Sequence, residues 1–283
     1  MIFEEEYTEI IQTFMLAARK AGEEILRIYN DDQFDVQLKG DNSPLTQADT
    51  ASHKVIKQIL SDVYPTIPLL SEEGKHIPYR VRKKWKTYIC VDPLDGTKEF
   101  IKRNGEFTIN IALIQDRRPV LGVIYIPCKD VLYFGGTGMG SYKIDTFSKL
   151  HSKFNSLSSA RKQFVPLPCA DSGRVFTVVG SRSHMNDETR QFIDELRAKH
   201  NKINVVSAGS SLKFCLVAEG LADVYPRFAP TMEWDTAAAQ AIVEGSGGIV
   251  FDCAQVEALR YNKPQMENPF FIAYSMKCKG SMI

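Results

Sequence analysis

The chain has 283 residues, of which 44% are hydrophobic and 24% are charged, and its formal net charge is +1. This composition is typical of globular proteins, and the length allows one large or two medium domains. A nearly neutral charge gives no general attraction to nucleic acid or to membrane surfaces. No apolar run approaches the ~20 residues of a membrane span. We therefore expect neither nucleic acid nor a membrane as a partner.

Six cysteines are scattered along the sequence, and no pair has the Cys-x-x-Cys spacing of a zinc or redox motif. Cys90, Cys215 and Cys253 lie among apolar residues, which predicts buried free thiols. The acidic amino terminus lacks the pattern of a signal peptide. Together these features favour a cytoplasmic location.

Apolar residues recur at helical spacing over residues 5–29, which predicts a long amphipathic helix. A second helix is predicted to begin at Ser43 or Thr46 and to run through Leu60. The basic run at residues 80–86 predicts a solvated face in front of a strand rather than a nucleic-acid site.

The segment Thr87 to Val91 is β-branched, aromatic and apolar, which predicts a buried strand that ends at Asp92. Asp92-Pro93-Leu94-Asp95-Gly96-Thr97 then places two carboxylates on a tight turn. Anionic oxygens in this arrangement suit a hard cation such as Mg²⁺. The amides of Gly96 and Thr97, at the expected start of a helix, could bind a phosphate. The alternative is an ordinary acidic surface turn, because Asp-Gly is common in turns.

Two further segments supply acidic side chains. The apolar stretch Ile67 to Leu70 leads into Glu72 and Glu73. Asp235 precedes an expected helix over residues 236–244, where a carboxylate either interacts with the helix dipole or serves as a plain N-cap. Carboxylates delivered by three separate element ends are what closely spaced divalent ions in phosphatases require.

The middle of the chain predicts a meander with strands at residues 107–114, 120–126, 131–134 and 141–144. The glycine-rich stretch Gly135 to Gly140 resembles a nucleotide loop, but it lacks the Lys-Ser/Thr of a P-loop, so a hairpin turn is the simpler interpretation. Residues 146–173 are basic and serine-rich, which predicts a linker or mobile loop.

Strand and helix patterns alternate in the last part of the chain, which predicts an α/β layer. The strands are expected at residues 175–179, 203–206 and 222–225, and the helices at 187–199, 210–219 and from Asp235 onward.

Three segments, Leu70 to Gly74, Asp92 to Thr97 and Trp234 to Ala238, resemble in order and spacing the inositol monophosphatase superfamily of Mg²⁺-dependent, lithium-sensitive phosphatases. Further segments are similar to one group within it, the 3′(2′),5′-bisphosphate nucleotidases or CysQ-like proteins. These segments are Asp95 to Ile101, Gly180 to His184, Ser210 to Gly220 and Tyr225 to Phe228. The resemblance covers about Leu45 to Phe271.

The resemblance implies an α/β (α+β) fold, a layered α-β-α-β-α sandwich of the inositol monophosphatase and fructose-1,6-bisphosphatase type, with the metal site between its two halves. Residues 1–145 would form an α+β half with most metal ligands. Residues 174–283 would form an α/β half with the nucleotide-binding residues and Asp235, and residues 146–173 would join the halves.

The resemblance also implies two or three Mg²⁺ ions. Glu72, Asp92 and the carbonyl of Leu94 would hold the first ion. Asp92, Asp95 and Asp235 would hold the second, with Asp92 bridging. Glu73 would either reach a third, weaker ion or only support Glu72.

The segment Leu45 to Asp49 is similar to the Thr-x-Ala-Asp segment of the family. This similarity implies that Asp49 hydrogen-bonds the hydroxyl of Thr97 and that Thr97 aligns the attacking water. Asp49, Thr97 and Glu72 form the implied catalytic set, and Gly96 and Thr97 the phosphate-binding pair. On the residues alone, Asp49 would be read as one more acid on a helix surface.

The nucleotide-binding residues implied by the resemblance lie in the second half. Ser183 and His184 are similar to adenosine-contacting positions, although His184 alone would be read as a structural loop histidine. Ser210 and Lys213 match the Ser-x-x-Lys of the group, and Arg227 matches its basic residue on the next strand. Lys213 and Arg227 would meet the phosphate that is not cleaved, a task that suits the planar fork of arginine.

The implied activity is hydrolysis of the 3′-phosphate of 3′-phosphoadenosine 5′-phosphate to AMP and phosphate by metal-activated water. One alternative is an inositol polyphosphate 1-phosphatase or inositol monophosphatase-like activity. Another is a non-catalytic nucleotide-binding regulator, which is disfavoured because every acidic ligand expected of an active site is present. The expected partner is a small bisphosphorylated nucleotide, and the sequence indicates no oligomeric state.

Overall fold

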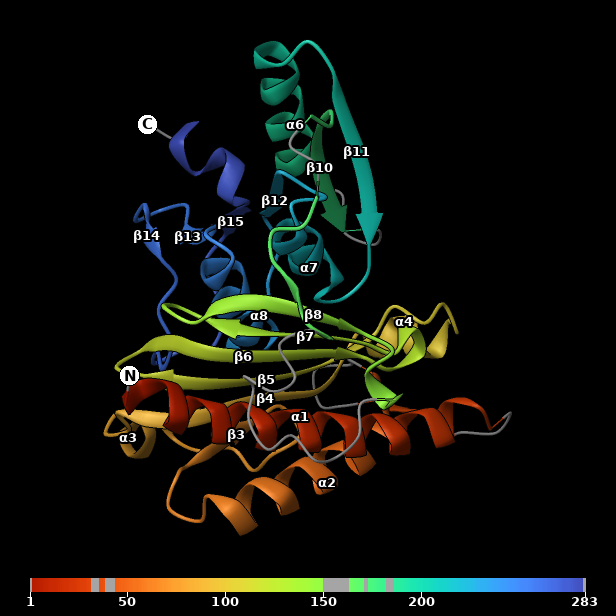
Figure 1. The fold of residues 1–283 in the computed structure, drawn as a ribbon, viewed down its shortest axis with the longest axis vertical. Helices are drawn as coiled ribbons and strands as arrows, with labels where there is room; N and C mark the ends of the chain where they lie inside the picture. The colour runs from red at the N-terminus through yellow and green to blue at the C-terminus, as the bar shows by residue number, and fades with distance from the viewer. Residues whose placement is uncertain are drawn as a thin grey trace.

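The computed structural model describes residues 2–31, 36–38, 44–149, 163–170, 173–181 and 186–281. Layers of helices alternate with two mixed sheets (Figure 1). The layers are, in order, α1 (Ile2–Tyr29) with α2 (Gln47–Val63), a seven-stranded sheet, α7 (Leu212–Glu219) with α8 (Glu233–Gly245), a six-stranded sheet, and α6 (Asp187–Lys199). The expected α-β-α-β-α sandwich is therefore confirmed.

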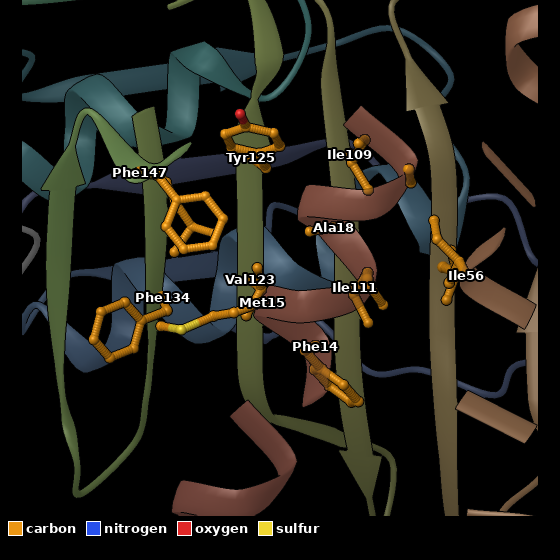
Figure 2. Packing of buried hydrophobic residues seen from close by; sticks show 14 of the residues in the cluster. Phe14, Met15, Ala18, Ile56, Ile109, Ile111, Val123, Tyr125, Phe134 and Phe147 are labelled. Carbon is orange, nitrogen blue, oxygen red and sulfur yellow. The ribbon is translucent and has the colours of Figure 1, made fainter. Parts of the chain in front are cut away.

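The outer helices α1 and α2 cover one face of the seven-stranded sheet. Figure 2 shows Phe14, Met15 and Ala18 of α1 facing the strand residues Ile111 and Val123 in one buried cluster. The predicted helix at residues 5–29 is confirmed, since its apolar positions form the buried side of α1.

Helix α2 begins where the sequence predicts, after Thr46. The Thr46 hydroxyl accepts the amide of Ala48 at 3.2 Å, and Asp49 Oδ2 accepts the amide of Thr46 at 2.8 Å. These reciprocal bonds satisfy amide groups that the first turn of a helix otherwise leaves unpaired. The helix continues to Val63, three residues beyond the predicted end.

The seven-stranded sheet has the order β3-β4-β5-β6-β7-β8-β9. Its strands are β3 (Leu69–Ser71), β4 (Thr87–Asp95), β5 (Thr108–Gln115), β6 (Arg118–Ile126), β7 (Val131–Gly136), β8 (Gly140–Asp145) and β9 (Val165–Pro166). β3 is parallel to β4, and each later pair of neighbours is antiparallel. Gly136 pairs with Gly140 across the β7–β8 hairpin, so the glycine-rich stretch is a turn, as expected.

Strand β4 does not end at Asp92, contrary to the prediction. It continues through Pro93 to Asp95, and its register against β5 shifts between Asp92 and Asp95. Proline has no amide hydrogen, so it is tolerated at such an irregular place in a ladder. The next helix, α4 (Thr97–Ile101), begins after Gly96, which adopts a left-handed φ of +92°.

The six-stranded sheet has the order β11-β10-β12-β15-β13-β14. Its strands are β10 (Phe176–Ser181), β11 (Ile203–Ala208), β12 (Val224–Arg227), β13 (Ile249–Asp252), β14 (Glu257–Ala258) and β15 (Phe271–Tyr274). β10 runs parallel to β11 and β12, which confirms the predicted α/β alternation, whereas β15 is antiparallel to both of its neighbours. Strands β13 to β15, which follow α8, were not predicted.

Two segments differ from their expectations. The expected linker contains β9, and the amides of Cys169 and Ala170 donate to the carbonyl of Glu219; residues 150–162 and 171–172 lie outside the described residues. The basic run is exposed as predicted at Arg80, Lys83, Lys84 and Lys86, with one exception. Arg82, at the end of α3 (Tyr79–Arg82), is buried, and its guanidinium donates to Asn262 Oδ1 at 3.1 Å and to two loop carbonyls.

The remaining elements are short. They are β1 (Val36–Leu38), β2 (Pro44–Thr46), and the 3₁₀ turns η1 (Pro127–Lys129), η2 (Phe147–Lys149) and η4 (Met276–Ser281). All six cysteines are free thiols, with Cys90 and Cys215 buried as predicted and Cys253 only half-buried. Among the residues described, no helix has the length and apolar character that a membrane crossing requires.

Strand β6 and helix α8 approach each other so closely that only glycine fits at Gly122. A Cβ atom there would lie 2.2 Å from the carbonyl oxygen of Ala238. We expect Gly122→Ala to lower the free energy of unfolding by about 2–3 kcal/mol, because backbone must move. Gly138→Ala is the control, since open space surrounds that position and only its φ of +82° opposes alanine. Denaturant unfolding that ranks the control as the more damaging change would contradict this close contact.

Candidate active site

Three carboxylates from distant parts of the sequence meet at the end of β4. Glu72 directly follows β3, Asp92 lies within β4 and Asp235 lies in the first turn of α8. One oxygen atom from each carboxylate lies within 4.8 Å of the other two. The amide of Glu72 donates to the carbonyl of Val91 at 3.1 Å, which holds Glu72 alongside Asp92.

The negative charges of these three carboxylates would be stabilised by a bound cation. Burial raises the pKa of Asp92 well above its usual value, and the charges of Glu72, Asp95 and Asp235 raise it further. Burial likewise raises the pKa of Asp235, with Asp95 and then Glu72 adding to the effect. Carboxylates at this spacing, one buried and two half-buried, repel one another unless a positive ion compensates them. An all-oxygen, anionic donor set fits Mg²⁺ or another hard divalent ion.

Asp95, expected to hold the second ion, lies beside this group of three but is not part of it. Its Oδ2 accepts hydrogen bonds from Ser210 Oγ at 2.6 Å and from Ser211 Oγ at 3.0 Å. Asn110 of β5 in turn donates to Ser211 Oγ at 3.0 Å. The sequence analysis gave no role to Ser211 or Asn110, because neither residue has a local signal that points to Asp95.

The other expected ligands also surround the end of β4. Leu94 is buried, and its amide donates to Asp92 Oδ1 at 3.0 Å, which orients that carboxylate. Gly96 is tightly enclosed, since a Cβ atom there would lie 3.2 Å from both the carbonyl oxygen of Glu106 and the Cβ of Ser210. Glu73 is half-buried, and its charge contributes to raising the pKa of Asp49.

The hydrogen bond expected between Thr97 and Asp49 is present, and the Thr97 hydroxyl donates to Asp49 Oδ1 at 3.0 Å. Thr46 fixes the other carboxylate oxygen through its amide and its hydroxyl, at 2.8 and 2.5 Å. Burial raises the pKa of Asp49, whereas the hydrogen bonds from Thr46 and Thr97 lower it. Asp49 is thus a buried, fixed carboxylate and not an acid on the helix surface.

Helix α2 makes two further contacts to the site that the sequence analysis missed. The hydroxyl of Ser52, which is fully buried, donates to the carbonyl of Pro93 at 2.6 Å. His53, the next residue and one turn from Asp49, has its Nδ1 2.9 Å from the hydroxyl of Ser71, the residue before Glu72. Their spacing from Asp49 is the only sequence signal that could have identified them.

Lys213 and Arg227 lie near each other in the second half. Lys213 Nζ donates to the carbonyl of Ser210 at 2.6 Å and lies 5.4 Å from the ring centroid of Tyr225. Burial lowers the pKa of Lys213 to about 8, against the opposing charge of Asp95, and the charge of Arg227 lowers it further. Arg227 Nη2 donates to the carbonyl of Pro230 at 3.0 Å, whereas its buried Nε has no hydrogen-bond partner among the described residues. Adjacent cations with an unused donor favour an anion between them.

The expected nucleotide contacts are only partly described. Ser183 and His184 lie outside the described residues. Ser210 adopts a φ of +48° and bonds to Asp95 and, at 2.7 Å, to Thr108 Oγ1. It therefore connects the acidic end of β4 to the start of α7, the helix that carries Lys213.

Comparison with known proteins identifies the family of this chain. The sequence profile of the inositol monophosphatase family matches residues 6–270. The chain is 44% identical over 236 residues to the 3′(2′),5′-bisphosphate nucleotidase CysQ of Escherichia coli strain K12, covering 83% of this chain and 87% of the relative. It is 35% identical to the protein of the same name from Aggregatibacter actinomycetemcomitans, covering 94% and 92% of the two chains.

The structural comparison agrees as well. The crystal structure of CysQ from Bacteroides thetaiotaomicron, described as a bacterial member of the inositol monophosphatase family, superposes with a TM-score of 0.85. That protein is 50% identical in sequence, and the match covers 94% of this chain and 98% of the other. The inositol monophosphatase of Thermotoga maritima, at 19% identity and a TM-score of 0.71, shares the fold. The chain therefore belongs to the inositol monophosphatase family.

Proposed function

We propose that this protein is a Mg²⁺-dependent 3′(2′),5′-bisphosphate nucleotidase that hydrolyses the 3′-phosphate of 3′-phosphoadenosine 5′-phosphate to AMP and phosphate. The observation that carries the proposal is the group of Glu72, Asp92 and Asp235, in which Asp92 is buried and one oxygen of each carboxylate lies within 4.8 Å of the other two. The substrate assignment is supported by the CysQ nucleotidases, which reach 44% identity over most of the chain.

Two or three Mg²⁺ ions would be held by the acids around the end of β4. Glu72, Asp92 and the carbonyl of Leu94 would bind one ion, and Asp92, Asp95 and Asp235 a second, with Glu73 near a weaker third. When bound, the ions would acidify a water and stabilise negative charge on the phosphoryl and leaving oxygens. Such ions also relieve the repulsion that raises the pKa values of Asp92 and Asp235.

Thr97 and Asp49 would orient the attacking water. The Thr97 hydroxyl donates its hydrogen bond to Asp49 Oδ1 at 3.0 Å, so its oxygen remains able to accept a hydrogen bond from that water. Thr46 prevents Asp49 from turning away, because it binds the other oxygen twice. Burial favours proton uptake by Asp49, in keeping with a proton acceptor at the end of this relay. Gly96 and Thr97, at the start of α4, would contribute amides to the scissile phosphate.

The second half would recognise the rest of the nucleotide. Lys213 and Arg227 would bind the 5′-phosphate, and the unpartnered Nε of Arg227 is a ready donor for it. Ser183, His184 and Ser210 would contact the nucleoside. Residues 1–145 and 174–283 would act as two halves joined by residues 146–173. The six free thiols favour the cytoplasm as the compartment.

Two alternative functions can be distinguished by measuring which phosphate esters, if any, the protein hydrolyses. An inositol polyphosphate 1-phosphatase or inositol monophosphatase-like activity would use the same acids, and it is favoured only by the common fold. A non-catalytic nucleotide-binding regulator would not need these three clustered carboxylates, which are costly to keep together without a cation.

The first test is phosphate release from 3′-phosphoadenosine 5′-phosphate, inositol 1,4-bisphosphate and 3′-AMP. We expect the bisphosphorylated nucleotide to be preferred, with activity that EDTA removes and Mg²⁺ restores. Asp92→Asn should lower kcat by at least about a thousandfold, because several kcal/mol of metal-dependent stabilisation is lost. A tenfold preference for inositol 1,4-bisphosphate would establish the first alternative. Nucleotide binding without any phosphate release would establish the second.

Thr97→Val and Asp49→Asn should each lower kcat by about a hundredfold, the usual scale of general acid–base effects. Both residues serve one relay, so the double variant should be little worse than either single variant. Mg²⁺ affinity, measured by calorimetry, should change little in all three. Losses that multiply fully in the double variant would mean that the two residues act independently.

Lys213→Met and Arg227→Ala should weaken kcat/KM for the bisphosphorylated nucleotide far more than for 3′-AMP, which lacks the 5′-phosphate. A charge-assisted hydrogen bond contributes roughly 1.5–3 kcal/mol, or about ten- to a hundredfold. The exposed Lys199→Met variant serves as a control for the loss of one positive charge. Equal losses on both substrates would place these residues at the cleaved phosphate or in the scaffold.

A further inference from the structure

Glu233 is a fully buried carboxylate that the proposed reaction does not use. It lies two residues before Asp235, at the start of α8. Its Oε1 accepts the amide of Lys263 at 2.9 Å and the ammonium of the same residue at 2.8 Å. Its Oε2 accepts the amide of Asn262 at 2.8 Å. This carboxylate therefore binds α8 to the loop between β14 and β15.

That loop is itself held by Arg82 of α3. The guanidinium donates to Asn262 Oδ1 at 3.1 Å and to the carbonyls of Lys263 and Pro264 at 2.5 and 2.9 Å. Asn262 Nδ2 returns a hydrogen bond to the carbonyl of Arg82 at 2.7 Å. The backbone that donates to Glu233 is thus fixed from its far side.

The same loop fixes the peptide that orients Asp235. Asn268 Nδ2 donates to the carbonyl of Met232 at 2.7 Å, and the amide of Glu233 donates to the carbonyl of Met266 at 2.9 Å. The amide of Met232 then donates to Asp235 Oδ2 at 2.9 Å. One oxygen of Asp235 is therefore directed by a turn whose Met232–Glu233 peptide the loop holds at both its carbonyl and its amide.

Glu233 also faces the strand that carries Asp92. The hydroxyl of Tyr88, in β4, lies 3.5 Å from Glu233 Oε2. The contacts of Glu233 therefore connect the turn that orients Asp235 to the strand that carries Asp92. If the salt bridge with Lys263 only added stability, Glu233 would not also need to contact the turn that orients Asp235 and the strand that carries Asp92.

We propose that Glu233 is a positioning residue, which holds Asp235 at the correct distance from Asp92 and thereby sets the affinity for a divalent cation. The inference rests on the proposed function, in which Asp235 is a metal ligand. Residues that orient metal ligands from behind typically change metal affinity about ten- to a hundredfold when they are substituted. Glutamine at this position keeps the shape of the side chain but replaces one carboxylate oxygen with an NH₂ group, which cannot accept a hydrogen bond. It also removes the charge that pairs with Lys263, so the turn should shift.

The test compares Glu233→Gln with Glu219→Gln by calorimetric titration with Mg²⁺ alone and by the Mg²⁺-induced rise in Tm. Glu219 is a matched control, because it is also buried and accepts from Lys143 Nζ at 3.2 Å and from Tyr133 at 2.7 Å. We expect Glu233→Gln to weaken Mg²⁺ binding by about tenfold or more and to raise the Mg²⁺ concentration for half-maximal activity equally. Its kcat at saturating Mg²⁺ should stay within about threefold of the wild type, and Glu219→Gln should bind Mg²⁺ normally.

Lys263→Met provides a second variant if Glu233→Gln does not fold. It keeps both backbone donors and removes only the ammonium, so Mg²⁺ binding should weaken in the same direction by about threefold. Wild-type Mg²⁺ affinity in the folded variants, even with a lower Tm, would overturn the positioning role and leave the proposed function intact. Absence of Mg²⁺ binding by the wild type would overturn both.

Discussion

The constraint on which this structure depends is the close approach of three like-charged carboxylates, one of them buried and two half-buried. Glu72, Asp92 and Asp235 repel one another, and burial raises the pKa values of Asp92 and Asp235. A flexible scaffold would relieve the repulsion by moving the acids apart. Each acid is instead attached to an element end whose backbone is paired or capped. The amide of Leu94 holds Asp92, and the amide of Met232 holds Asp235.

The same requirement explains how the two sheets are connected. Helix α8, which carries Asp235, packs against strands β4 to β8 and also contacts β13 of the other sheet. Its approach to β6 is close enough to exclude a Cβ atom at Gly122. Ser210 and Ser211, in the loop before α7, bond to Asp95 at the end of β4. A displacement of one sheet relative to the other would therefore change the distances between the acids, because only these few contacts separate them from both sheets.

Features with a local signature could be predicted from the sequence. The helical spacing of α1, the β-branched run of β4 and the glycine hairpin after β7 each follow from a short stretch of residues, and all three are observed. The acids near Asp92 were identified in the same way. The layered order of the sandwich followed from a family resemblance and not from periodicity.

Features that depend on contacts between distant segments could not be predicted. Arg82 reads as part of a solvated basic run, yet it is buried, because the loop carbonyls that accept its protons come about 180 residues later. Ser211 and Asn110 have ordinary local surroundings, and only the fold brings them to Asp95. The extension of β4 through Pro93 likewise depends on its pairing with β5.

Helix α2 contacts the site with residues one turn apart on a single face. Asp49 reaches Thr97, Ser52 reaches the carbonyl of Pro93 and His53 reaches Ser71. Because an α-helix turns by about 100° per residue, these three positions lie within an arc of about 100°. A single inserted residue between Asp49 and Ser52 would turn the second pair of contacts away from the site while leaving the helix intact. A change of length at this place would therefore remove two contacts at once, whereas a substitution removes one.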